Sequence, residues 1–367
     1  MKLLLLTTPT QQISGISRVD FQIIKQLTKH TNVTVGYFQP LHVPLFLQKI
    51  VSFCFNKDLQ GIFNNIPFKL PQNNFSSYDI IYIMNQQNTL ALNWIPTKKV
   101  IVSVRDVIKN QQDNKIGSFI LSLYQKACFL GIKKAPILIT DSESEKKHII
   151  QTLHYKKNII TIPLGIDPKE FHKQKKCKKP FFFASQCNVL FVGTEEKRKN
   201  FPTVLKAIAY LKKSIPTIRL IKVGNPLIQS ERIKNIQLIQ KLGIEQNVFF
   251  VGHIEKGIAK YYNAADVLVM PSLKEGFGFP ILEAMACGCP VIASQCDSLP
   301  EIGKDAIEYI DDPFDYKNLA NKISILLTHT KIRNNNVSKG LKRAKDFSWD
   351  ITGNKIVSLC YSIMKGK

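Results

Sequence analysis

Residues 271–293 read PSLKEGFGFPILEAMACGCPVIA, and no single periodicity explains this stretch. The apolar run at residues 267–270 predicts a buried strand, and Gly276 and Gly278 then open a loop in which backbone can approach a ligand closely. Pro280 is typical of a first helical turn, and the glycine and apolar run that follow predict the helix end and a second buried strand. Because free backbone N–H groups gather at a helix N-terminus, this order of elements predicts a binding site for an anion such as a diphosphate.

Two glutamates stand out within this stretch. Glu275 lies in the glycine loop and Glu283 in the first turn of the predicted helix, so they need not act as an acid/base pair. Their spacing, with Gly-Phe-Gly-Phe-Pro and Ala-Met-Ala-Cys-Gly-Cys-Pro around them, resembles the donor-site signature of the retaining glycosyltransferase family 4 (glycosyltransferase group 1) and its GT-B relatives. The alternative is a buried βαβ crossover that merely carries surface glutamates.

Short apolar strands alternate with amphipathic helices along the chain, which predicts a doubly wound α/β fold. We predict strands near residues 2–6, 33–37, 79–84, 100–104, 137–140 and 159–163, and near 188–192, 219–223, 248–251, 267–270 and 290–293. A basic run from Lys173 to Lys179 lies between the two halves. We therefore predict a domain boundary between residues 172 and 173, and the resemblance implies an acceptor-side domain at 1–172 and a nucleotide-sugar-binding domain at 173–348. The resemblance implies a GT-B fold with two facing Rossmann-like domains, a cleft between them, and a C-terminal helix at 349–367 that packs back on the first domain.

The loop after the first strand of the second half contains two adjacent cations. Arg198 and Lys199 precede the helix predicted from Phe201 and follow Gly193 and Thr194. A departing nucleoside diphosphate needs positive charge, which these side chains could supply without a metal. A lysine and arginine before a helix are also typical of a solvated turn. The resemblance implies that Arg198 and Lys199 contact the diphosphate, and that they act in catalysis together with Glu275.

The resemblance also implies separate roles for the two glutamates. Glu275 corresponds to the residue that contacts the donor sugar hydroxyls near the reacting carbon, and Glu283 to the one that hydrogen-bonds the ribose. A carboxylate that accepts two hydroxyls suits a ribose diol. The phenylalanines of the glycine loop are expected to pack beneath it. The implied donor-binding residues are Gly15, Gly193, Thr194, Gly276, Phe277, Gly278, Phe279 and Glu283.

The first half offers fewer candidates. Gly15 follows the first predicted strand and precedes an amphipathic helix, which resembles the family's glycine loop beside the donor phosphate and acceptor. The family often has a His-Asp pair after the fourth strand, whereas this chain has Arg105 and Asp106 there. These two residues are candidate acceptor or sugar contacts. Arg105 either contacts acceptor or phosphate or pairs structurally with Asp106.

Length and composition set the class of protein. The 367 residues suffice for two domains, and 44% hydrophobic with 21% charged residues is typical of a globular protein. No apolar run approaches the roughly 20 residues that cross a bilayer. The opening run at residues 3–6 is too short for a secretory signal. Eight scattered cysteines, without a Cys-x2-Cys pair, predict cytoplasmic thiols and no metal site.

The formal net charge of +24 is the compositional outlier. Such charge suits nucleic acid, an anionic membrane or an acidic substrate. No helix-turn-helix, zinc-finger or RNA-binding signature is present, so nucleic acid is not an expected partner. The apolar and cationic segment from Leu41 to Phe55 is either a core helix or a peripheral contact with the cytoplasmic membrane face.

The implied activity is the transfer, with retention, of a hexosyl group of mannose or glucose type from a UDP- or GDP-sugar to a hydroxyl of a glycan or lipid-linked acceptor. Lipopolysaccharide or polysaccharide biosynthesis is the expected setting, and no metal or other cofactor is expected. Retaining hydrolases use a nucleophilic carboxylate with a partner, and no such pair is evident here. The alternatives are another GT-B enzyme such as an epimerase or phosphorylase, a basic nucleic-acid-binding protein, or a non-catalytic partner subunit.

Overall fold

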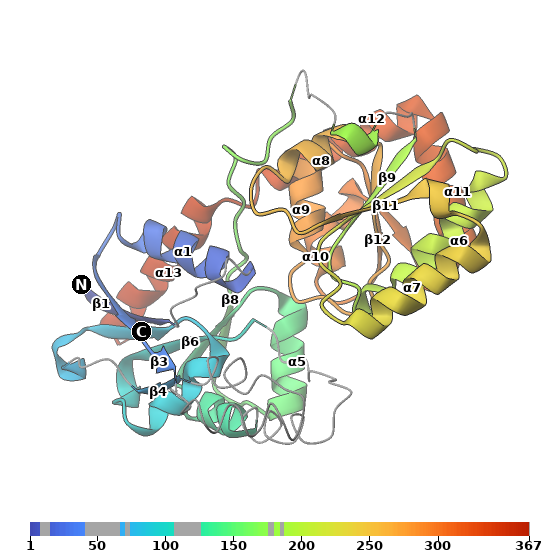
Figure 1. Cartoon of the computed structure of the whole chain (residues 1–367). Coiled ribbons are helices and arrows are strands. Elements are labelled where there is room, and N and C mark those ends of the chain that lie inside the picture. Colours follow the sequence, from blue (N-terminus) through green and yellow to red (C-terminus); the bar gives the residue numbers. More distant parts are fainter. Residues whose placement is uncertain are drawn as a thin grey trace, which may run out of the picture. The chain divides into compact units, whose positions relative to one another are not determined.

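The chain folds as two compact units in the computed structural model (Figure 1). Unit 1 comprises Met1–Leu164 with Trp349–Lys367, and unit 2 comprises Gly165–Ser348. The described residues are 1–7, 15–40, 67–69, 74–105, 126–174, 180–183 and 187–366. The candidate Asp106, the segment from Leu41 to Phe55 and most of the basic run therefore lie outside the described residues.

Unit 1 contains a six-stranded parallel sheet in the order β2-β1-β5-β6-β7-β8. All strands predicted for the first half are present, and the sheet buries the apolar runs of its central strands β1, β5 and β6 completely or nearly so. Their bounds are β1 Lys2–Thr7, β2 Asn32–Tyr37, β5 Ile80–Ile83, β6 Val100–Ser103, β7 Ile137–Thr140 and β8 Asn158–Thr161. Its helices include α1 Gly15–Leu27, α5 Glu143–Leu153 and α13 Trp349–Met364, and a small antiparallel pair is formed by β3 Gln39–Pro40 and β4 Pro67–Lys69.

Unit 2 contains a second six-stranded parallel sheet, in the order β11-β10-β9-β12-β13-β14. Its strands are β9 Asn188–Val192, β10 Arg219–Val223, β11 Val248–Gly252, β12 Val267–Met270, β13 Val291–Ser294 and β14 Glu308–Ile310. Its helices are α6 Phe201–Lys212, α7 Gln229–Leu242, α8 Ala259–Ala264, α9 Phe279–Ala286, α10 Leu299–Gly303, α11 Tyr316–Thr328 and α12 Thr330–Ala344. The sequence did not predict β14, which is three residues long, begins with a glutamate and so lacks an apolar run.

Both sheets are doubly wound, but their strand orders differ. Counted along the chain, the sheet strands of unit 2 lie in the order 3-2-1-4-5-6 of the Rossmann fold, and those of unit 1 lie in the related order 2-1-3-4-5-6. In each sheet the direction of strand addition reverses next to the first strand, between β1 and β5 in unit 1 and between β9 and β12 in unit 2. Loops that leave the carboxyl ends of strands at such a reversal diverge, and ligands bind there. The predicted α/β GT-B architecture of two Rossmann-like units is thus confirmed. The expected ligand sites are the carboxyl ends of β1 and β5 in unit 1 and of β9 and β12 in unit 2.

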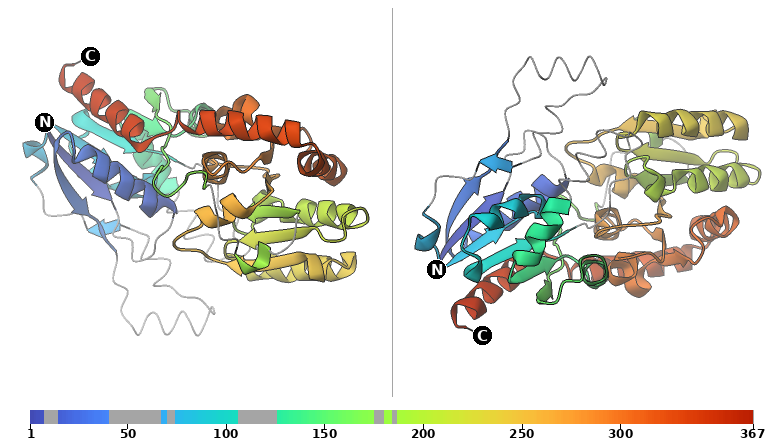
Figure 2. Two further views of the ribbon diagram at one scale, coloured as in Figure 1. Left: turned by 90° about the horizontal axis from the view of Figure 1, so that it is seen from above. Right: turned by 90° about the horizontal axis from the view of Figure 1, so that it is seen from below.

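The C-terminal helix α13 packs beside α1 on unit 1 (Figure 2). Gly353 allows the close approach, because a Cβ there would lie 2.6 Å from the Cβ of Gln26. Thr352 Oγ1 donates a hydrogen bond to the carbonyl oxygen of Pro163 at 2.8 Å, and Lys29 Nζ pairs with Asp350 at 3.0 Å. The prediction that the terminal helix returns to the first half of the chain is confirmed.

Candidate functional site

Two loops at the carboxyl ends of β9 and β12 are joined through their backbones. The first contains a tight turn at Lys197–Lys199, and the second is the glycine loop quoted above. The backbone N–H of Leu273 donates to the carbonyl oxygen of Arg198 at 2.7 Å, and Arg198 Nη1 donates to the carbonyl oxygen of Lys274 at 3.4 Å. These bonds bring Arg198 and Lys199 beside Glu275, although the sequence separates them by 76 residues or more.

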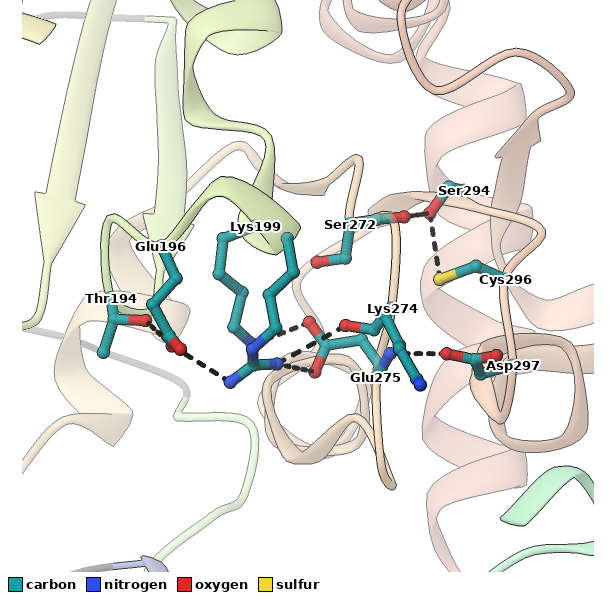
Figure 3. A network of polar contacts seen from close by, with 10 residues as sticks. Thr194, Glu196, Lys199, Ser272, Lys274, Glu275, Ser294, Cys296 and Asp297 are labelled. Atoms are coloured by element: carbon teal, nitrogen blue, oxygen red, sulfur yellow. Dashed lines mark hydrogen bonds and ion pairs between the residues drawn. The ribbon is translucent and has the colours of Figure 1, made fainter. Parts of the chain in front are cut away.

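Glu275 accepts contacts from both cations (Figure 3). Lys199 Nζ lies 2.6 Å from Oε1, and Arg198 Nη1 lies 3.6 Å from Oε2. The carboxylate and Lys199 are nearly buried, with side-chain exposures of 6% and 11%, whereas Arg198 is 30% exposed. The site thus combines a closely held carboxylate with a cation that solvent reaches.

Glu196 orients the other side of Arg198. Its Oε2 accepts a hydrogen bond from Thr194 Oγ1 at 2.6 Å and pairs with Arg198 Nη2 at 3.1 Å. Burial acts to raise the pKa of Glu196, but the hydrogen bond from Thr194 and the charge of Arg198 outweigh it and lower that pKa. The predicted residues Thr194, Arg198, Lys199 and Glu275 are therefore brought together by the fold.

The start of α9 is shaped by a glycine. Gly278 is the N-cap residue with φ +93°, and a Cβ there would lie 2.7 Å from Leu299 Cδ2. Phe277 is buried, and its ring packs edge-on against Phe279 at 5.1 Å and against Phe347 at 6.2 Å between centroids. The prediction that the loop's aromatic side chains pack within the fold is confirmed for Phe277.

Glu283 is the fifth residue of α9, because the helix begins at Phe279, so its prediction in the first turn was wrong. Its Oε2 accepts a hydrogen bond from Tyr262 Oη at 2.7 Å, and both side chains are buried. Burial raises the pKa of Tyr262 well above its ordinary value, so the phenol remains a donor. The hydroxyl of Tyr262 thus fixes one oxygen of the second glutamate of the signature.

Sequence reasoning missed a buried ionic network behind the cation loop. Glu195 pairs with Lys222 Nζ at 3.0 Å and accepts two hydrogen bonds from Arg232 Nε at 2.8 and 2.9 Å and one from Asn235 at 3.1 Å. Burial acts to lower the pKa of Lys222 and to raise that of Glu195, whose hydrogen bonds outweigh burial and lower it. A lysine in the middle of an apolar strand was the available signal, because a buried charge requires a partner.

Asn200 was also missed as a structural residue. It has φ +52° at the start of α6, and its side-chain amide donates to the carbonyl oxygens of Pro271 at 3.1 Å and Pro313 at 2.6 Å. Its Oδ1 accepts from Thr203 Oγ1 at 2.8 Å. Asparagine adopts positive φ more readily than most residues, so its type at this position fits both tasks.

Arg105 lies in unit 1 and pairs with Asp20 of α1. Its Nη1 lies 2.6 Å from Asp20 Oδ1, and Asp20 Oδ2 accepts from Thr7 Oγ1 at 2.7 Å. Arg105 and Asp20 side chains are each 9% exposed. Nε and Nη2 of Arg105 are buried and have no hydrogen-bond partner among the described residues. The structural alternative for Arg105 therefore has an observed partner, but it is 85 residues away in the sequence.

Two further groups of unit 1 lie near Arg105. Burial raises the pKa of Asp141 to about 7, although Arg105 acts to lower it. Burial likewise raises the pKa of Tyr82 to about 12, with Arg105 and a 2.6 Å hydrogen bond to Ser103 acting to lower it. Gly15 is the first residue of α1. The described part of unit 1 thus places a closed charge cluster at the ends of β1, β6 and β7.

The described residues show neither a cluster of metal-ligating side chains nor a membrane-spanning helix. No group of three or more His, Cys, Asp or Glu side chains there is arranged to hold a metal ion. No helix in that part of the chain combines the length and hydrophobicity needed to span a bilayer.

Comparison with known proteins gives three results. Residues 172–343 match the family described as glycosyl transferases group 1. The O-antigen chain mannosyltransferase B of Escherichia coli is 30% identical over 237 residues, which cover 62% of this chain and 60% of that protein. A D-inositol 3-phosphate glycosyltransferase of Segniliparus rotundus is 26% identical over 239 residues, which cover 62% of this chain and 53% of that protein. The matches thus span less than two thirds of these curated relatives.

Solved structures show the same fold over the whole chain. A sucrose-phosphate synthase of Thermosynechococcus elongatus aligns with a TM-score of 0.73 and 21% identity over 100% of both chains. The Anabaena HepE protein in complex with UDP-glucose aligns with a TM-score of 0.73 and 19% identity over 99% of this chain and 100% of that one.

Proposed function

We propose that the protein transfers a hexosyl group from a nucleotide sugar to an acceptor hydroxyl, because residues 172–343 match the group 1 glycosyltransferases. The donor is a UDP- or GDP-sugar of mannose or glucose type, and the anomeric configuration is retained. The observation that carries the proposal is the contact of Arg198 and Lys199 with Glu275 at the carboxyl ends of β9 and β12.

The two cations suit a leaving diphosphate. As the bond between the anomeric carbon and the phosphate oxygen breaks, negative charge grows on that oxygen. Arg198 and Lys199 are already ordered by Glu196 and Glu275, so little reorganisation is needed when the charge appears. The N-terminus of α9 adds a partial positive charge from its backbone N–H groups. These groups supply positive charge from the chain itself, and we propose that transfer requires no metal.

Retention follows if the acceptor attacks from the face that the diphosphate leaves. The acceptor hydroxyl forms the new bond to the anomeric carbon, and its proton passes to the departing phosphate oxygen. In this scheme Glu275 binds hydroxyls of the transferred sugar, and no carboxylate forms a covalent intermediate. Glu283 binds the ribose diol, with its orientation set by Tyr262.

The acceptor is proposed to be a glycan or a lipid-linked sugar. The E. coli relative is an O-antigen chain mannosyltransferase, which supports a polysaccharide acceptor. The net charge of +24 favours peripheral contact of a cytoplasmic protein with an anionic membrane surface, where a lipid-linked acceptor would be found.

A thermal-shift screen with UDP-, GDP- and ADP-sugars tests the donor site. A ligand that binds only the folded state raises the melting temperature, by an amount equivalent to about 2.7 kcal/mol at a concentration of 100 Kd. We expect a shift from one nucleotide class, and a smaller shift in Glu283→Ala measured against its own ligand-free protein. Glu245→Ala is the matched control, because Glu245 is exposed before the edge strand β11, whereas the site lies at the central strands β9 and β12.

Turnover is then measured as release of the nucleoside diphosphate, with and without a hydroxyl acceptor and with EDTA. We expect release to depend on the sugar nucleotide that gave the shift and to survive EDTA. Absence of a shift from every donor, or release that EDTA abolishes, would contradict the proposed site or its metal independence respectively.

A further inference from the structure

Asp297 has an unusual backbone conformation next to the candidate site. It follows β13 in the loop that leads to α10, and its φ is +45°. L-residues rarely adopt positive φ, and aspartate, asparagine and glycine are the types that tolerate it best. A non-glycine residue keeps a positive φ only where contacts with the surrounding structure stabilise that conformation. The residue type is therefore suited to a position where both the backbone turn and the side chain are used.

The side chain of Asp297 contacts the backbone of Glu275. Its Oδ2 accepts a hydrogen bond from the Glu275 N–H at 2.8 Å (Figure 3). The carboxylate of Glu275 is held at its other end by Lys199 and Arg198. Glu275 is thus fixed from two directions, by the loop after β13 at its backbone and by the loop after β9 at its side chain.

We propose that Asp297 is a positioning residue that fixes Glu275 toward the transferred sugar. The role rests on the proposed function, because it requires that Glu275 bind hydroxyls of that sugar. Two glycines follow Glu275 closely, at 276 and 278, and they leave the backbone free to rotate if no other bond restrains it. Without Asp297, the printed contacts of Glu275 with described residues are those of its carboxylate with Lys199 and Arg198, and its backbone loses the bond that sets the direction of the side chain. The carboxylate would then pivot about the two cations and present its oxygens less accurately to the sugar.

A separate contact already joins the same two loops. Ser294 Oγ donates to the carbonyl oxygen of Ser272, so the start of the glycine loop is attached to the end of β13 without Asp297. Loss of the Asp297 hydrogen bond should therefore alter the position of Glu275 more than the stability of unit 2. This separates a positioning role from a structural one.

Three substitutions divide the two properties of Asp297. Asp297→Asn keeps an acceptor oxygen and tolerance of positive φ. Asp297→Gly keeps the backbone freedom and removes the acceptor. Asp297→Ala removes the acceptor and strains the backbone. Each is assayed for kcat and KM with the sugar nucleotide, for affinity of the nucleoside diphosphate by calorimetry, and for melting temperature.

We expect Asp297→Asn to stay within about threefold of wild type. Asp297→Gly should lose about 10- to 100-fold in kcat, because displacement of a positioning group by about 1 Å has effects of that size. Its affinity for the nucleoside diphosphate should be unchanged, since that ligand lacks the transferred hexosyl group that Glu275 is proposed to bind. Asp297→Ala should show the same loss in kcat together with a lower melting temperature. If the glycine variant does not fold, the alanine variant measures the effect of removing the acceptor.

A double variant tests whether Asp297 acts through Glu275. In the Glu275→Gln background, Asp297→Gly should add little further loss of kcat, because the group that it positions is already altered. Losses that multiply, or a kcat of Asp297→Gly equal to wild type, would overturn the role. Failure of the wild-type protein to release nucleotide from any donor would instead overturn the proposed function and this role with it.

Discussion

The two sheets are both parallel and doubly wound, but the charges at their carboxyl ends are arranged differently. In unit 1, Arg105 and Asp20 form a closed pair in which each side chain is 9% exposed. In unit 2, Lys199 and Arg198 share Glu275, and Arg198 is 30% exposed. The first pair joins the end of β6 to α1, and the second cluster joins the loops after β9 and β12.

This difference shows that topology supplies a position but not a chemistry. A buried pair neutralises its own charge and leaves little for a ligand, and it stabilises the fold only while both partners remain. A cluster with an accessible cation can exchange part of its contacts for a ligand at a lower desolvation cost. We therefore assign stability to the unit 1 cluster and ligand binding to the unit 2 cluster. Each prediction below tests one side of that assignment.

The largest effect is expected from breaking the buried pair of unit 1. Arg105→Met leaves the Asp20 carboxylate buried with only the Thr7 hydroxyl as a described partner, and should lower the free energy of unfolding by about 3–5 kcal/mol. The two tryptophans, Trp94 and Trp349, both belong to unit 1, so their fluorescence in a urea titration reports this unit. Lys29→Met is the matched control, because its exposed pair with Asp350 should contribute less than about 1 kcal/mol. Equal, small losses of unfolding free energy in both variants would contradict the assignment of a stabilising role to the Arg105–Asp20 pair.

The next largest effect is catalytic and concerns unit 2. Lys199→Met should reduce kcat about 10²- to 10³-fold, or about 3 kcal/mol in activation free energy, because a preorganised positive charge is lost from the leaving diphosphate. Nucleotide release is the measurement, and tryptophan fluorescence should show unit 1 unchanged. Lys197→Met, in the same turn but exposed, should retain wild-type turnover. An unchanged rate in Lys199→Met would reject the catalytic assignment of this cluster.

The two clusters should also respond to pH in opposite directions. Burial raises the pKa of Asp141 to about 7, so between about pH 4 and 7 folded unit 1 retains a proton that the unfolded chain releases, and its stability falls as pH rises. The pKa of Glu196 is lowered, so its contribution to unit 2 is present above the unfolded pKa and is lost as pH falls. Asp141→Asn should stabilise unit 1 at pH 8 by on the order of 2 kcal/mol relative to wild type, and by less at pH 5. Urea titrations followed by tryptophan fluorescence at both pH values measure this difference for unit 1, and an equal effect of Asp141→Asn at pH 5 and pH 8 would contradict it.

The smallest effect concerns the second glutamate of unit 2. Tyr262→Phe removes the hydrogen bond to Glu283 and should weaken donor binding by about fivefold, or about 1 kcal/mol. Tyr261→Phe is the matched control, since Tyr261 is also buried and its contacts in the structure are with a ring and a lysine. Calorimetry with the sugar nucleotide should separate the two variants. Equal donor affinities of the two variants would show that the hydrogen bond of Tyr262 does not contribute to donor binding.

The sequence was informative where the signal is local. The parallel strands were predicted because each is an apolar run bounded by turn residues, and only the short and partly polar β14 was missed in the two main sheets. Gly278 was recognised as a loop residue because its type suits positive φ, which the structure shows. The start of α9 was placed slightly late, since Phe279 carries no signal of its own for the first helical position.

Partners distant in the sequence were not predicted. Arg105 was considered with the adjacent Asp106, but its observed partner is Asp20 on α1. The Glu195 network was missed because Lys222 and Arg232 lie on later elements. The contact of Asp297 with Glu275 depends on the loop after β13 turning back toward the loop after β12. The spacing of residues along the sequence does not indicate such long-range contacts.

The sequence by itself determined the fold class and the residue types of the candidate site, because hydrophobic periodicity, glycine and proline positions and the Glu275 to Glu283 context are properties of contiguous chain. The tertiary structure alone decided which charges pair, which are buried and which remain accessible. The physical reason is that a charge has its effect through the atoms within a few ångströms and through its exposure to water, and both are set when strands distant in the sequence become neighbours in a sheet.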